Sequence, residues 1–223
     1  MRRRRTQAAR SAATRRALVE SAVRQLIAHG YAGASVRNIA RDSGLSSGAV
    51  QYHFKGKEDV VIAALTHLFA EMAQHLAAPG PRDTAIDKRA RHIVETLWAF
   101  YGGTSYIAVL EVLVATRPQA ALHRRIRRAC HRGFAAACRD IGERLLGERP
   151  RAPGARHDLL QFVIATLCGL ALLRLQERDR QRVEPHLARL RDLVAAALRL
   201  DRSPSAAQAV ARRANLSSGG WYR

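Results

Sequence analysis

The chain has 223 residues, of which 48% are hydrophobic, and this composition suits one or two folded domains with a substantial core and excludes a wholly disordered protein. Its 38 basic residues outnumber 18 acidic ones, and the net charge of +20 indicates a polyanionic partner, either nucleic acid or an anionic membrane surface. The basic N-terminus lacks a following apolar segment and no stretch approaches the roughly 20 apolar residues of a membrane span, so we expect a cytoplasmic protein without a membrane helix.

The positive charge is concentrated at the N-terminal end. Residues 1–57 hold 12 basic and two acidic residues, which amounts to half of the excess positive charge in about a quarter of the length. A basic patch at one end favours nucleic acid as the partner. The alternative is a general arginine bias of the genome, because only three of the 38 basic residues are lysines.

Helical spacing of apolar residues begins near the N-terminus. A first helix is predicted over residues 14–29, and Gly30 follows it as a C-terminal stop. Ser35 precedes a second, short helix that ends at Gly44, and Ser46 precedes a third, "SGAVQYHF". Serine hydroxyls accept hydrogen bonds from the first free amides of a helix, so both serines are predicted caps.

The remaining chain is also helical in pattern, and no alternating strand pattern competes with it. Helices are predicted from Lys57 to just before Pro79 and then over 83–101, 105–115, 119–146, 157–179 and 185–200. The fold class is therefore all-α. The predicted domains are a basic disordered arm (1–11), a three-helix domain (12–58), a larger helical domain (59–200) and a disordered tail (201–223).

The second and third helices, joined by "SGLS", form a helix-turn-helix pattern. A helical wheel of the third helix places Val50 and Phe54 inside and Gln51, Tyr52 and Lys55 outside. In such a unit the second helix enters the major groove, where the paired donor and acceptor of a glutamine match the edge of adenine.

Serines, basic residues and a groove-facing glycine surround this helix, and free helix amides attract phosphate. The predicted DNA-binding residues are Ser35, Arg37, Ser46, Ser47, Gly48, Gln51, Tyr52, His53, Lys55 and Lys57. His53 lies on the flank of the helix, where packing against the first helix is as good an interpretation as a phosphate contact. The alternative for the whole set is a small helical subdomain with a solvated polar face.

The segment from about residue 12 to 65 resembles the N-terminal domain of TetR-family transcriptional regulators, on "HGY", "ASVRNIARDSGLSSGAV" and "HFKGKEDV". The resemblance implies an all-helical homodimer that binds operator DNA and commonly represses until a small ligand enters the C-terminal domain. Gln51 departs from the family, which most often has tyrosine there, so base readout by this amide becomes plausible. Gly56 replaces a more usual small polar cap.

The C-terminal region offers candidates for dimerisation and ligand binding. The resemblance implies that the helices near 157–179 and 185–200 pair across a two-fold axis. Aromatic residues and one acid in the middle helices are candidate ligand contacts. They are Trp98, Tyr101, Tyr106, Glu111, Phe134 and Phe162. The alternative is core packing for each aromatic and a pair with an arginine, such as Arg125, for the acid.

Together with the resemblance to the family, the sequence predicts a sequence-specific homodimeric repressor that a small apolar or amphipathic ligand releases from its operator. A basic protein that coats DNA without sequence preference is the competing function. No enzyme motif, such as a P-loop, HExxH or G-x-S-x-G, occurs in the sequence. Cys130, Cys138 and Cys168 are odd in number and lack CxxC spacing, so we expect no zinc site, disulfide framework or cofactor.

Overall fold

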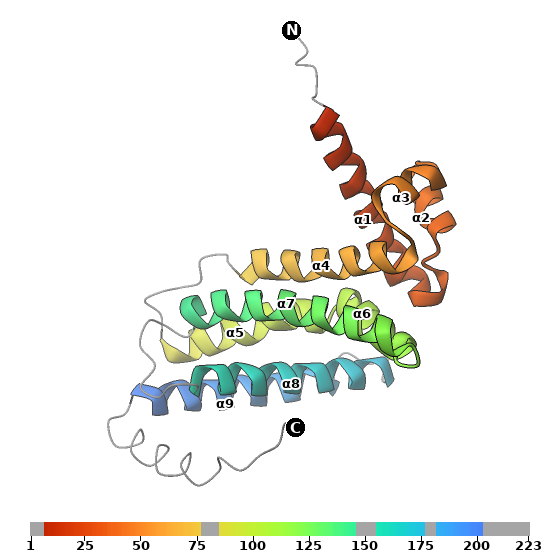
Figure 1. Cartoon of the computed structure of the whole chain (residues 1–223). Helices are drawn as coiled ribbons and strands as arrows, with labels where there is room; N and C mark the ends of the chain where they lie inside the picture. Colours follow the sequence, from red (N-terminus) through yellow and green to blue (C-terminus); the bar gives the residue numbers. More distant parts are fainter. Residues whose placement is uncertain (1–6, 77–84, 146–154, 177–181, 203–223) are drawn as a thin grey trace. The chain divides into compact units, whose positions relative to one another are not determined.

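The computed structural model describes residues 7–76, 85–145, 155–176 and 182–202, and these ranges contain helices and no strand (Figure 1). The predicted all-α fold class is therefore confirmed for the described residues. The helices are α1 (Gln7–Gly33), α2 (Val36–Ser43), α3 (Ser47–His53), α4 (Lys57–Leu76), α5 (Ile86–Tyr101), α6 (Thr104–Thr116), α7 (Ala120–Leu145), α8 (Ala155–Gln176) and α9 (Glu184–Arg202). Most of the predicted arm and tail lies outside the described residues.

The chain divides into two compact units. The first combines residues 1–74 with residues 103–137 and therefore contains α1, α2, α3, α6 and most of α4 and α7. The second combines residues 75–102 with residues 138–223 and contains α5, α8 and α9. The boundaries differ from the continuous domains expected from the sequence, because segments distant in the chain pack together within each unit.

Helix α1 begins earlier than predicted. The sequence predicts a disordered arm to residue 11 and a helix from about residue 14, whereas the helix starts at Gln7. Four of the seven residues 7–13 are alanine, the strongest helix former, and this explains the extension. The predicted stop is confirmed: Gly30 has φ 63° and ψ −173°, which interrupts the helix with a kink before its last turn.

The core of the first unit forms where α1 meets α2. Leu18, Ala22 and Leu26 follow one another at intervals of four residues on α1, and all three are fully buried. Ile39 of α2 is fully buried as well, and α1 packs against both α2 and α6. This packing fixes α2 on α1, and α3 packs in turn on α2.

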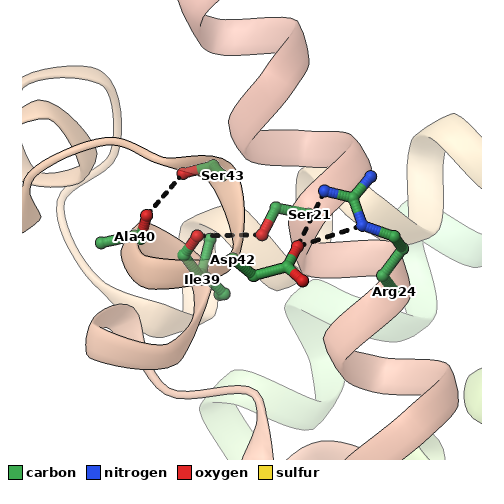
Figure 2. A network of polar contacts seen from close by, with 6 residues as sticks. All are labelled: Ser21, Arg24, Ile39, Ala40, Asp42 and Ser43. Atoms are coloured by element: carbon green, nitrogen blue, oxygen red, sulfur yellow. Dashed lines mark hydrogen bonds and ion pairs between the residues drawn. The ribbon is translucent and has the colours of Figure 1, made fainter.

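Two polar contacts reinforce the junction of α1 and α2 (Figure 2). The buried hydroxyl of Ser21 donates to the carbonyl of Ile39 at 2.9 Å, so a backbone acceptor inside the core is satisfied. The Arg24 guanidinium donates to Asp42 Oδ2 through Nη2 at 2.7 Å and through Nε at 3.0 Å. The Ser21 hydroxyl and then the Arg24 guanidinium lower the pKa of the Asp42 carboxyl, although partial burial opposes them.

The lowered pKa of Asp42 predicts a small loss of stability in acid. A carboxyl with a folded-state pKa below its ordinary value of 3.8 adds stability above that value and loses the contribution as pH falls through the folded-state pKa. We expect an effect of at most about 1 kcal/mol, because the pair is largely exposed. Urea unfolding of wild type and Asp42→Asn should give curves that differ at pH 6 and converge in strong acid; a constant difference across this range would contradict the assignment.

In the second unit, α5 packs against α8 and α9, and α8 packs against α9. Leu97 of α5, Leu167 of α8 and Leu190 of α9 are almost completely buried. The Arg174 side chain on α8 donates a hydrogen bond to the carbonyl of Gly102, at the C-terminal end of α5. A cation at that position is favourable because free carbonyls give a helix C-terminus a partial negative charge.

Helix α8 corrects one prediction. The sequence is expected to contain no segment approaching a membrane span, but Asp158–Leu175 is long and apolar enough to cross a membrane by length and composition alone. Only 33% of this window is buried. The core helix of a soluble protein meets the same criterion.

Candidate nucleic-acid interface

The turn between α2 and α3 is built from two caps and one glycine. Ser35 Oγ accepts from the amide of Asn38 at 3.1 Å, and Ser46 Oγ accepts from the amide of Ala49 at 3.2 Å. Both predicted caps are thus confirmed. Gly44 ends α2 with φ 69° and ψ 21°, and its amide donates to the carbonyls of the last helical turn. This left-handed conformation favours glycine and reverses the chain sharply into α3.

Helix α3 has the predicted inner and outer faces. Val50 is fully buried and Phe54 is 6% exposed, whereas Gln51 is exposed and Tyr52 is 81% exposed. His53 is half-buried, and its ring meets the Tyr52 ring edge to face with centroids 5.0 Å apart. The amide and the phenol therefore extend into solvent from a helix that is anchored on its opposite side.

Lys55 does not lie on this helix. The helical wheel extends α3 through residue 55, but α3 ends at His53 and Phe54 is extended, with φ −141° and ψ 135°. The chain has to leave α3 before α4 begins, and the Lys55 amide donates to Asp59 Oδ2 in the first turn of α4 at 3.3 Å. Lys55 is exposed beside α3 and can still reach phosphate, but the prediction that it shares the outer face of the helix is wrong.

Lys57 has a structural role that the sequence did not indicate. Its ammonium donates to the carbonyl of Tyr31 at 2.5 Å and lies 4.1 Å from the centroid of the Tyr31 ring. Burial lowers the pKa of the Lys57 ammonium, an effect that the neighbouring Glu58 opposes. The lysine thus connects the start of α4 to the end of α1, and this contact explains the presence of a lysine at position 57. Its predicted contact with phosphate stays a prediction.

Exposed basic side chains lie on α1 and α2. Arg37 and Arg41 are exposed on α2, and Arg10, Arg15 and Arg16 are exposed on α1. The Arg15 guanidinium lies 5.0 Å from the centroid of the Phe54 ring and so connects α1 to the end of α3. Sequence reasoning did not identify Arg15, because only the fold brings residues 15 and 54 together.

Gly48 provides a test of close approach between this helix and DNA. An added Cβ there would meet nothing nearer than Ser46 Oγ at 3.7 Å. We expect Gly48→Ala to leave the free energy of unfolding unchanged or to raise it by up to about 1 kcal/mol, because alanine is the better helix former. Because the added methyl separates the helix from the groove, we expect affinity for specific DNA to fall about tenfold. Urea unfolding and DNA titration check both results, and unchanged affinity would place Gly48 outside the interface.

The candidate ligand residues are divided between the two units. Trp98, Tyr101 and Phe162 belong to the unit of α5, α8 and α9, whereas Tyr106 and Glu111 belong to the unit that carries α3. Tyr101 and Tyr106 are 2% and 8% exposed, as packed core residues are. The side chain of the sixth candidate, Phe134, lies outside those that the structure describes. A ligand site formed by these residues stays a prediction.

Two of these candidates lie in surroundings that the sequence did not predict. Phe162 is 52% exposed on α8, so it is not packed in the core of its unit, and its predicted ligand contact stays a prediction. Glu111 does not pair with Arg125, because Arg125 forms an ion pair with Asp59. Instead, the carboxylate of Glu111 lies so close to Gly30 that a Cβ added at Gly30 would be 2.7 Å from its Oε2.

Comparisons with known proteins agree with this geometry. The model of the family "Bacterial regulatory proteins, tetR family" matches residues 18–64. The HTH-type transcriptional regulator CymR of Pseudomonas putida is 27% identical over 185 residues, which cover 81% of this chain and 89% of CymR.

Solved structures show the same fold over most of the chain. A TetR-family regulator from Rhodococcus sp. superimposes with a TM-score of 0.62 and 20% identity, and the match covers 82% of this chain and 99% of that one. FadR from Bacillus subtilis, solved in complex with stearoyl-CoA, superimposes with a TM-score of 0.60 and 14% identity. The match covers 82% of this chain and 98% of FadR.

Proposed function

Because the chain is a transcriptional regulator of the TetR family with a helix-turn-helix DNA-binding domain, and not an enzyme, we propose that it is a homodimeric, cytoplasmic repressor of specific genes. A small apolar or amphipathic ligand releases it from its operator. The observation that carries the proposal is the outer face of α3, where Gln51 and Tyr52 are exposed on a helix fixed from behind by Val50 and Phe54. Such a rigid, outward polar face suits base contacts in a major groove.

The proposed dimer interface consists of two apolar stripes, which we call the α8 stripe and the α9 stripe. The α8 stripe contains exposed Phe162, Ala165, Gly169 and Leu172, and the α9 stripe contains exposed Leu193, Ala196 and Leu200. Intervals of three and four residues place each set on one side of its helix. Exposed apolar stripes of this kind mark interaction surfaces, and a second copy of the chain supplies matching stripes.

These stripes also account for the apolar character of α8. Val163 and Leu167 face the core of their unit and are almost fully buried, while the α8 stripe lies on the opposite side. A helix buried on one side by its own unit and on the other by a partner is apolar nearly all round. We therefore assign the apolar window of α8 to dimerisation and not to a membrane.

A ligand-responsive role rests on the resemblance to the family and on its second helical unit. FadR from Bacillus subtilis, which shares the fold, has been solved with stearoyl-CoA, an amphipathic molecule. Because the identity is 14%, the likeness extends to the fold alone. We propose an apolar or amphipathic effector for this chain on the same architectural grounds.

The function is tested through Gln51. We expect Gln51→Ala to lose about 1–3 kcal/mol of discrimination at particular base pairs of the operator and to leave affinity for random DNA unchanged. The measurement is competitive binding to an operator duplex and its single-base variants at fixed salt. Gln119→Ala, which removes an exposed glutamine between α6 and α7, is the matched control. Equal weakening on all sequences would show that Gln51 has only a phosphate or packing role.

A further inference from the structure

The solvent face of α7 carries an unusual density of positive charge. Five arginines and one histidine occur within nine residues, and no acidic residue occurs from residue 117 to 137. All six side chains are exposed: Arg124, Arg125, Arg127, Arg128, His131 and Arg132. Leu122, Ile126 and Ala129, on the opposite side of the helix, are buried and hold it in the first unit.

Most of this charge has no acidic partner. Arg125 forms an ion pair with Asp59 of α4. Among the described residues, Arg124, Arg127, Arg128 and Arg132 form no ion pair. Side chains three and four positions apart lie next to one another on a helix, so these arginines repel each other. Repulsion of this kind is relieved when an anion binds between the side chains.

The arginines surround an open recess and not an enclosed cavity. The recess has a volume of about 500 Å³, within the range of small-molecule sites in proteins. Arg124, Arg127, Arg128, His131 and Arg132 provide its cationic lining, and Leu113 of α6 and Cys130 complete it. Burial raises the pKa of the Cys130 thiol to about 11, so the thiol is protonated and adds no negative charge to the recess.

We propose that the recess between α6 and α7 binds a small organic polyanion that carries two or more adjacent phosphate groups. The planar guanidinium group matches phosphate oxygens in pairs, and several arginines converge here from successive turns of one helix. A single phosphate occupies one or two of them, whereas adjacent phosphates engage them together. Leu113 offers contact to an apolar part of the same ligand.

A compact ligand fits this site better than duplex DNA. A compact ligand with adjacent phosphates can contact several arginines of the recess at once, whereas a DNA duplex presents its phosphates one by one along its backbone. The proposed site also lies on α6 and α7, whereas the proposed base-contacting face belongs to a different helix, α3. This assignment goes beyond the proposed function and does not depend on it.

The test is isothermal titration calorimetry of the full-length protein with inorganic tripolyphosphate as the probe, at a fixed ionic strength of about 0.15 M. We expect one tripolyphosphate per chain, bound at least about tenfold more tightly than inorganic phosphate. The double variant Arg124→Gln/Arg128→Gln should weaken tripolyphosphate binding at least about tenfold. Arg189→Gln, which removes an exposed arginine from α9, should leave it unchanged.

Two further variants keep the test decisive. Arg37→Gln/Arg41→Gln on α2 should retain tripolyphosphate binding, because these arginines belong to the DNA-binding face. Circular dichroism and thermal unfolding of the α7 variant should match wild type, since only exposed, mutually repelling charges are removed. The proposal is overturned if the α7 variant binds tripolyphosphate as wild type does, if the α2 variant loses the binding instead, or if only duplex DNA binding depends on Arg124 and Arg128.

Discussion

Replacing Leu172 and Leu193 with glutamate should convert the proposed dimer into monomers and lower affinity for a palindromic operator by about a thousandfold. Leu172 and Leu193 are both 49% exposed and belong to the α8 and α9 stripes. Charges at these positions lose their hydration without gaining a partner when two copies associate. A monomer then contacts one half-site at a time, and its affinity approaches that for non-specific DNA.

Sedimentation velocity measures the mass of the particle, and titration of an operator duplex measures the affinity. Val114→Glu is the matched control, because Val114 is 71% exposed on α6 and lies outside both stripes. The control should remain dimeric with unchanged affinity. A double variant that sediments as a dimer would contradict the assignment of the stripes to the interface.

Replacing Gly30 with alanine should lower the free energy of unfolding by about 1–3 kcal/mol. The φ of 63° and ψ of −173° at Gly30 lie in a region that is open essentially to glycine alone. An added Cβ would also lie 2.7 Å from Glu111 Oε2, although the flexible end of that side chain can move away. Backbone strain is therefore the main cause of the expected loss.

Gly44→Ala provides the comparison for Gly30→Ala. Gly44 also has a positive φ, but its ψ of 21° is in the ordinary left-handed region and no atom lies within 4 Å of an added Cβ. We expect a loss of about 1 kcal/mol at Gly44, smaller than at Gly30. Urea unfolding measures both losses, and Gly30→Ala combined with Glu111→Ala isolates the contribution of the side-chain contact. Equal losses at the two glycines would refute the explanation by backbone strain.

The helix-turn-helix could be predicted in detail because its signals are local. Ser35, Gly44 and Ser46 each act on amides or carbonyls within a few residues, and the spacing of Val50 and Phe54 defines the inner face of α3. These interactions involve residues that are close in the sequence, so the residue pattern predicts them. The same reasoning failed at Lys55, because the helical wheel assumes that a helix continues and cannot show where the chain turns towards α4.

Contacts between distant segments could not be predicted. From the sequence, Lys57 is predicted to contact phosphate. The fold, however, places its ammonium against the carbonyl of Tyr31. Glu111 lies beside Gly30 instead of pairing with Arg125 for the same reason. Each of these partners is more than 20 residues away in the chain, and only packing of α1 with α4 and α6 decides the pairing.

The charged face of α7 illustrates a different limit. In the sequence its arginines are part of a net charge of +20, which indicates a polyanionic partner and favours nucleic acid only through the basic patch in residues 1–57. The sequence does not show that Leu113 and Cys130 form a recess with the arginines. Charge can be counted from a sequence, whereas concave shape requires the positions of two helices.

The central claim is sequence-specific DNA binding by a dimer, and selection of duplexes from a randomised pool tests it most directly. At physiological salt we expect enrichment of a palindrome with half-sites about one helical turn apart, or a multiple of this spacing, because the two α3 helices of a dimer read equivalent sequences. The selected duplex should bind at least about a thousandfold more tightly than random DNA of equal length. No enriched sequence and a ratio near one would contradict the account and favour a protein that coats DNA without sequence preference.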